Sequence, residues 1–230
     1  MDIAKLIETG RNLFKLLTGR AGEGYVPPGS VLVPAGPGAS ASQPVVPGPA
    51  ATSGPPMPRA DMALTANFGL WELTKTNNAA LQAKNRILTD AQVRKLKEVA
   101  ELMEKVRTII GGAVDVHSGY RSPDLNAATK GAAPKSQHML CEACDWSPAG
   151  PDTEASIEAA FQKVLAAAKR GEIKFGQLIV EQAQRGYSKS IWVHVSIGRP
   201  YRAADRCGEV MRMVEKDGKA VYTLIERLPA

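Results

Sequence analysis

Apolar residues recur with a helical period in two stretches of the chain, residues 89–112 and 153–171. In the first, Thr89 and Gln92 can form a capping box, and Gly111-Gly112 ends the period. Its apolar stripe consists of Val93, Leu96, Val99, Ala100, Met103, Val106 and Ile110. In the second, Thr153 can cap the start and Gly171 marks the end. Both stretches predict amphipathic helices that bury one face in a core.

Strand patterns lie between and after these helices. Residues 113–117 and 177–181 predict short strands, and residues 191–196 predict a strand that returns beside the second one. The polar stretch at 182–190 is expected to be a loop between them. Helices and short strands mixed without a regular alternation predict an α+β fold around a small antiparallel sheet with flanking helices.

The C-terminal residues contain a strong turn signal. Asp217-Gly218 separates the strand-like stretches 209–214 and 220–225, and an Asp-Gly pair is typical of tight hairpins. We therefore expect residues 206–230 to form a β-hairpin extension of a domain that spans residues 61–205.

The first twenty residues carry a separate amphipathic pattern. One stripe of a short helix contains Ile3, Leu6, Ile7, Leu13, Phe14 and Leu17. Because no neighbouring segment can cover this stripe, we expect residues 1–20 to dock on a partner protein or on their own copies. Binding to a membrane surface is the less favoured alternative.

Residues 21–60 differ from the rest of the chain in composition. They are rich in Pro, Gly and Ala and almost without charge, which is typical of a disordered linker. Such a linker reaches roughly 35 Å as a coil and roughly 120 Å as extended polyproline. The sequence thus predicts a docking helix, a long tether and a working domain.

Charge and composition exclude several classes of protein. The net charge of +6 is spread along the chain, and no basic run is interleaved with aromatic residues, so nucleic-acid binding is not expected. No apolar run approaches membrane-spanning length. Charged residues interrupt the N-terminal apolar positions, so we expect no secretory signal and synthesis in the cytoplasm. Three cysteines make a poor disulfide framework and fit folding under reducing conditions.

Candidate chemistry centres on the stretch from Ser136 to Asp145. His138 and Asp145 can reach one cation if the chain turns after His138 and then runs extended. His194 shares a strand face with Trp192 and Ser196 in the predicted 191–196 strand. Two nitrogens and one oxygen, with a fourth position left to water, favour an open catalytic Zn²⁺ site.

Several separated motifs together resemble one family. They are Ser118-Gly119-Tyr120-Arg121-Ser122, Leu125-Asn126, Ser136-Gln137-His138 with Asp145, Gln177-Leu178-Ile179, and Trp192-Val193-His194-Val195-Ser196. In order and spacing they resemble the zinc D-alanyl-D-alanine carboxypeptidases, a family that includes phage peptidoglycan endopeptidases and vancomycin-resistance dipeptidases. The resemblance implies the fold shared with the Hedgehog signalling domain.

The resemblance also implies roles for individual residues. His138, Asp145 and His194 would be the zinc ligands. Arg121 would hold a substrate carboxylate or carbonyl, for which a planar guanidinium is suited, with Ser136 on the same wall and Tyr120 lining the pocket. The alternative for Arg121 is a structural role in bonding loop carbonyls.

Two positions depart from the family pattern. Some members carry the catalytic base three residues before the last histidine, where this chain has Ile191. Glu181, at the end of the predicted 177–181 strand, is the best substitute, against the alternative of a solvated carboxylate. Cys141 stands where the family usually has Gly, and it would strain the turn if an unusual backbone angle is needed there.

The remaining cysteine and histidine residues have less specific interpretations. Cys141 and Cys144 form a C-x-x-C pattern that could be a redox pair or another zinc site. Without a second pair or a thioredoxin-like context, buried small residues are the favoured interpretation. His117 is expected to be an outer group or a packed strand residue rather than a ligand.

These observations lead to one function and one alternative. The chain is expected to be a zinc metallopeptidase of the D-alanyl-D-alanine carboxypeptidase or endopeptidase type that cuts peptidoglycan peptides. The tether suggests attachment to a phage virion or to the host cell envelope, which a free endolysin would not need. The alternative is an inactive structural or cell-wall-binding virion protein that keeps the fold, motivated by Ile191 and Cys141.

Overall fold

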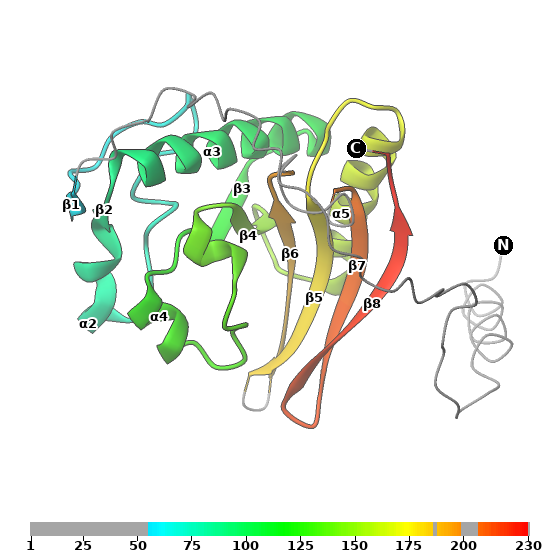
Figure 1. Ribbon diagram of the computed structural model, residues 1–230. Helices are drawn as coiled ribbons and strands as arrows, with labels where there is room; N and C mark the ends of the chain where they lie inside the picture. Colours follow the sequence, from blue (N-terminus) through cyan, green and yellow to red (C-terminus); the bar gives the residue numbers. More distant parts are fainter. Residues whose placement is uncertain (1–54, 186–187, 199–206, 230) are drawn as a thin grey trace, which may run out of the picture. The chain divides into compact units, whose positions relative to one another are not determined.

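The computed structural model describes residues 55–185, 188–198 and 207–229 (Figure 1). The predicted N-terminal helix at 1–20 and nearly all of the predicted linker at 21–60 lie outside the described residues. Among the described residues, no helix is long and apolar enough to cross a membrane.

Two long helices form where the apolar periods predicted them. Helix α3 spans Asp90–Ile110, begins with the Thr89–Gln92 capping box and ends at Gly111, whose φ of 79° is left-handed. Helix α5 spans Glu154–Lys169, and its Thr153 cap also forms a reciprocal box, here with Ser156. Shorter elements are α2 (Ala79–Gln82), η1 (Lys84–Arg86), α4 (Pro123–Ala128) and η2 (Gln137–Leu140).

A six-stranded sheet organises the domain in the order β3-β4-β6-β5-β7-β8. Its strands are β3 (Val114–Ser118), β4 (Ala143–Pro148), β5 (Gln177–Arg185), β6 (Ser188–Ser196), β7 (Glu209–Lys216) and β8 (Lys219–Arg227). A separate two-stranded ladder joins β1 (Met57–Pro58) to β2 (Ile87–Leu88). The fold is α+β, as the sequence predicts.

The sheet is mixed rather than purely antiparallel, which corrects the sequence prediction. Strands β5 and β7 run parallel, with Gln177 opposite Glu209, whereas the other neighbours are antiparallel. The connection explains this direction. Strand β6 ends beside the first residues of β5, at the same end of the sheet. Strand β7 starts from that end, after residues 197–208, and therefore runs in the same direction as β5.

Residues 182–190 also differ from expectation. Instead of forming a loop, most of them lengthen β5 and β6 into a continuous ladder that pairs Gln182 with Ile191 and Arg185 with Ser188. The predicted C-terminal hairpin is present, and Asp217 (φ 51°) and Gly218 (φ 73°) supply its left-handed turn. Both hairpins belong to the same sheet.

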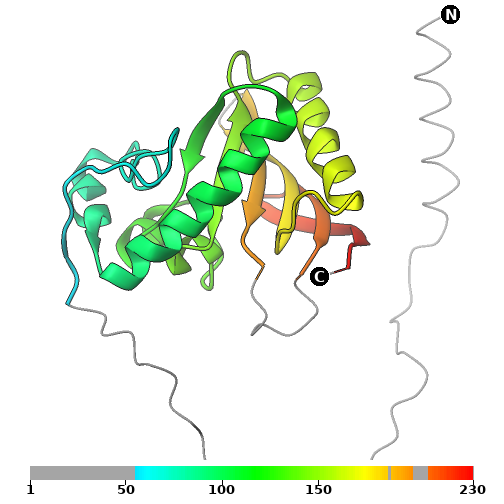
Figure 2. The same cartoon turned by 90° about the horizontal axis from the view of Figure 1, so that it is seen from above.

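One face of the sheet forms the core. Helices α3 and α5 contact each other and pack against this face (Figures 1 and 2). Residues of alternate strand positions point towards them, including Val116, Cys144, Trp146, Leu178, Val180, Val193, Val195 and Val210. Each fully buried large apolar side chain contributes about 1.5–3 kcal/mol, so this face fixes the register. The opposite face carries Asp145, Glu181 and His194.

Candidate metal centre

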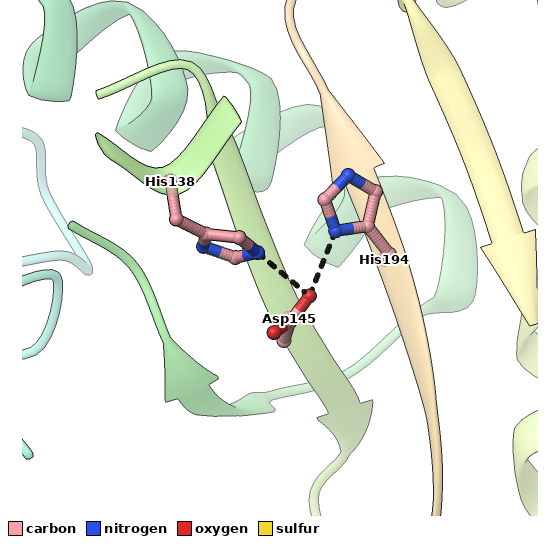
Figure 3. A group of neighbouring side chains, drawn as sticks. All are labelled: His138, Asp145 and His194. Carbon is pink, nitrogen blue, oxygen red and sulfur yellow. Dashed lines mark hydrogen bonds and ion pairs between the residues drawn. The ribbon is translucent and has the colours of Figure 1, made fainter. Parts of the chain in front are cut away.

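Asp145 and His194 meet because their strands are neighbours. The β4–β6 ladder pairs the two residues directly, so their side chains point to the same face of the sheet. His194 Nδ1 lies 2.8 Å from Asp145 Oδ1 (Figure 3). Both side chains are buried.

His138 reaches the same point from η2. Ser136 caps this turn by accepting the backbone N–H of His138, and His138 Nε2 lies 3.1 Å from Asp145 Oδ1. The two imidazole rings are 5.1 Å apart in an edge-to-face arrangement. The three candidate ligand atoms all lie within 4.8 Å of one another. The structure thus brings together the three residues that the sequence singled out as ligands.

The turn between His138 and β4 depends on an unusual backbone angle. Cys141 ends η2 with φ 56° and ψ 39°, which is the left-handed helical region. A residue with a Cβ atom adopts this region at a cost of about 1–2 kcal/mol, whereas Gly adopts it freely. This conformation explains why a glycine would suit the position, and Cys141 adopts it without separating the ligands.

The outer ring nitrogens of both histidines have oxygen acceptors. His138 Nδ1 lies 2.6 Å from the Gly119 carbonyl, and His194 Nε2 lies 3.1 Å from Gln137 Oε1. Each outer nitrogen therefore carries the proton, and the inner nitrogen presents its lone pair to the cluster. Two such nitrogens with one carboxylate oxygen are a donor set typical of zinc. The residues fit the ion that the sequence predicts.

Gly119 has no room for a side chain. A Cβ atom there would lie 2.3 Å from the Leu73 carbonyl oxygen, and the next residue, Tyr120, donates its N–H to that same oxygen at 2.7 Å. The Gly119 carbonyl that receives the His138 proton is therefore held by close backbone packing.

The pKa values of the cluster reflect its burial and its charges. Burial would raise the pKa of Asp145, but the two histidines outweigh it and hold that pKa well below the usual range. Burial lowers the pKa of His138 despite Asp145. Burial also acts to lower the pKa of His194, but the hydrogen bond and the charge of Asp145 outweigh this effect and raise that pKa overall. Asp145 is thus held ionised, as a cation ligand must be.

Arg121 lies beside the cluster and bonds its carboxylate. Its Nη2 donates to Asp145 Oδ2 at 2.9 Å, and its Nε donates to Ser118 Oγ at 3.0 Å. These contacts use two of the five N–H donors of a guanidinium. They place a partly buried positive charge at the edge of the cluster.

Glu181 points to the same face of the sheet. In the β5–β6 ladder, Ile179 is opposite His194 and Glu181 is opposite Trp192. Glu181 therefore lies two residues along β5 from the position opposite His194, and its side chain is the next one on that face. Only 9% of Glu181 is exposed. Burial and the charge of Asp145 raise the pKa of Glu181 to about 7, against the opposing effects of His194 and Arg121. A carboxyl group with this pKa can gain and lose a proton near neutral pH.

Ile191 is excluded as part of the site by its place on β6. It lies three residues before His194, and an odd separation on a regular strand puts two side chains on opposite faces. Ile191 packs against the hydrophobic core instead. Any residue at this position of the strand would face the helices.

Other predicted residues lie further from the cluster. Tyr120 is buried in the hydrophobic core, and its hydroxyl accepts a hydrogen bond from Gln92 Nε2 at 3.3 Å. His117 bonds Ser147 Oγ at 2.8 Å and is not one of the three clustered residues. Cys144 is a fully buried thiol whose pKa burial raises well above its usual value, as expected for a packed residue rather than a reactive one.

The sequence did not assign roles to Gln137 and Ser118. Both lie inside the quoted motifs, directly beside His138 and Gly119, and both are polar residues that can orient a neighbour. Their contacts with His194 and Arg121 depend on the tertiary fold, because 57 residues separate Gln137 from His194.

Comparison with known families agrees with this geometry. The model of the peptidase M15 family matches residues 66–178. This segment contains Arg121, His138 and Asp145, whereas Glu181 and His194 follow it. No curated protein gives a significant match to the chain.

Proposed function

The domain that contains residues 66–178 belongs to the peptidase M15 family, and on this premise we propose that the protein is a zinc metallopeptidase that hydrolyses an amide bond in peptidoglycan peptides. The observation that carries the proposal is the buried group of His138, Asp145 and His194 with Glu181 on the same sheet face. The mixed α+β sheet is compatible with the Hedgehog/D-alanyl-D-alanine peptidase fold.

The three clustered residues would hold the metal. His138 would bind through Nε2, His194 through Nδ1 and Asp145 through a carboxylate oxygen, because these atoms face one another. A zinc ion held there supplies a Lewis acid for the scissile carbonyl and for the attacking water.

Glu181 is the proposed general base. Its carboxylate takes a proton from the attacking water and then returns it to the leaving amine. A pKa of about 7 in the absence of the metal suits both steps, and a nearby cation would lower it by favouring the ionised form.

Arg121 is the proposed anchor for the substrate. Its guanidinium lies beside Asp145 and would bind the carboxylate or carbonyl of the peptide, which aligns the amide bond with Glu181. Ser136 and Tyr120 support the turn and the strand end around it, through the contacts described above.

The setting of this activity is also a proposal. A peptidase joined to a docking segment and a tether would act while attached to a phage virion or to the host cell envelope. Residues 1–20 would bind a partner protein or their own copies, and the modest positive charge would favour an anionic wall polymer.

The test is mass spectrometry of purified peptidoglycan fragments incubated with the zinc-loaded protein. We expect a defined mass loss that a chelator abolishes and that His138→Ala does not show. Unchanged fragments from several wall chemistries, with one zinc bound per chain, would contradict the proposal. That result would support the alternative of an inactive wall-binding or structural protein.

A further inference from the structure

The C-terminal hairpin adds surface to the face that carries the metal centre. Strands β7 and β8 follow the residues that match the peptidase family. Residues 209–214 of β7 pair with residues 177–182 of β5, so the hairpin extends the sheet directly beside Glu181. The sheet face that carries the metal centre is therefore wider than the strands of the matched segment alone would make it.

The register places one tyrosine in line with Glu181. Glu181 is opposite Met213 on β7, and Met213 is opposite Tyr222 on β8. Residues paired across a sheet point to the same face, so Tyr222 shares the face of the metal centre. Neighbouring strands are about 4.8 Å apart, so the Cα atoms of Tyr222 and Glu181 are about 10 Å apart.

The burial of Met213 indicates where the phenol lies. Met213 is only 6% exposed, although α3 and α5 pack on the opposite face of the sheet. Neighbouring side chains must therefore cover it. Tyr222 is its direct partner on the edge strand and is itself 49% exposed. A ring lying over Met213 brings its hydroxyl towards Glu181 and leaves one side open to a ligand.

Electrostatics agree with this position. Partial burial and the negative charges of Glu181 and Asp145 raise the pKa of Tyr222 to about 12, although Arg121 acts in the opposite direction. The charges that act on this phenol are those of the metal centre. The hydroxyl therefore remains a protonated hydrogen-bond donor at neutral pH.

We propose that Tyr222 is a substrate-binding residue of this site, whose hydroxyl donates a hydrogen bond to the peptide held at the metal centre. This inference rests on the proposed peptidase function. Leu224 and Met211, paired in the adjacent row of the same face, continue the apolar surface beside the ring. The hairpin would thus form the wall of the site opposite Arg121.

The test compares Tyr222→Phe with Thr223→Val. Both substitutions remove one hydroxyl from β8, but Thr223 is paired with Arg212 and points to the other face. The probe is a disaccharide pentapeptide fragment of peptidoglycan. We expect Tyr222→Phe to lower kcat/KM about two- to tenfold, the range of one hydrogen bond, with unchanged zinc affinity. Calorimetry on the metal-depleted protein should show a similar loss of affinity for the fragment.

The outcomes separate the two proposals. Equal kcat/KM and equal fragment affinity in Tyr222→Phe and Thr223→Val would overturn the role of Tyr222 while leaving the peptidase in place. If the wild type cleaves no fragment but Tyr222→Phe still weakens binding, the peptidase proposal fails and Tyr222 remains a ligand contact. Absence of both cleavage and binding in the wild type would overturn both.

Discussion

Asp145 and His194 are direct partners on neighbouring strands, and their side chains meet at 2.8 Å although 49 residues separate them in the chain. The register of the sheet therefore positions two of the three candidate metal ligands. A slip of one residue between β4 and β6 would turn His194 towards the helices and destroy the cluster. The apolar residues on the other face of both strands prevent such a slip.

Zinc binding should depend on the clustered histidines and not on the third one. We expect His138→Ala to weaken zinc binding more than about 100-fold, since loss of even an outer hydrogen-bond partner costs about 10- to 100-fold. His117→Ala should bind zinc as the wild type does, because His117 contacts Ser147 outside the cluster. Competition with a chromophoric chelator measures both. Equal losses in the two variants would contradict the assignment of the ligands.

The backbone at Gly119 should affect zinc affinity as well as the stability of the fold. Gly119→Ala forces a Cβ atom against the Leu73 carbonyl and should displace the acceptor of the His138 proton. We expect zinc affinity to fall about 10- to 100-fold. Gly112→Ala is the matched control, because its Cβ would meet no atom within 4 Å. Zinc affinity that is unchanged in Gly119→Ala would show that this carbonyl does not orient the ring.

Glu181→Gln should remove the base while leaving the metal site intact. We expect kcat to fall by a factor of about 10² to 10⁴, the range for a general base, with zinc still bound at one ion per chain. Glu172→Gln, which changes an exposed carboxylate paired with Arg170, should retain full activity. Full activity in Glu181→Gln together with loss of activity in His138→Ala would leave a peptidase whose base is another group.

The same glutamate should make the metal-depleted protein less stable as the pH rises. Its pKa is about 7 when folded and near 4.5 when unfolded, so the folded state binds the proton more tightly. The contribution of Glu181 to stability is therefore complete below pH 4.5 and is lost as the pH rises through 7, by up to about 3 kcal/mol.

Urea unfolding of the metal-depleted protein from pH 4.5 to 8 measures this effect. Glu181→Gln should lack that part of the decline, so its free energy of unfolding should exceed that of the wild type most strongly at pH 8. Parallel pH curves for the two proteins would show that Glu181 is not buried as an ionised group at high pH.

Cys141 offers a test of backbone strain. Within a helix or strand, a protein with Gly at a given position is ordinarily less stable than one with Ala there, by roughly 0.5–1 kcal/mol. At Cys141 the left-handed φ of 56° should reverse this order, so that Cys141→Gly is more stable than Cys141→Ala by about 1 kcal/mol. Both variants lose the buried thiol, so their difference in urea unfolding isolates the backbone. An advantage for Ala would mean that the turn relaxes to another conformation.

The sequence predicted the elements whose signals are local. Thr89 and Gly111 are recognisable helix ends, and Asp217-Gly218 is a recognisable turn, because each acts through its own residue type. The clustered residues His138 and Asp145 were predicted for a related reason: η2 and the start of β4 bring them together within a short stretch of chain.

The errors lie where distant segments decide the structure. Residues 182–185 and 188–190 are polar except for Ala183, and no apolar alternation distinguishes these strand ends from a loop. The parallel pairing of β5 with β7 depends on the path of the whole chain rather than on either strand. The position of Tyr222 depends on that pairing, so it could not be predicted from the residues around it.

The β4–β6 boundary divides the six-stranded sheet into an earlier pair of strands, β3 and β4, and a later group of four, β6, β5, β7 and β8. Asp145 belongs to the earlier pair and His194 to the later group. A metal ion bound by both would cross-link two units that otherwise meet through backbone hydrogen bonds and core packing. Its removal should accelerate amide hydrogen exchange at this boundary more than within either unit, and metal uptake would signal that the two units have docked.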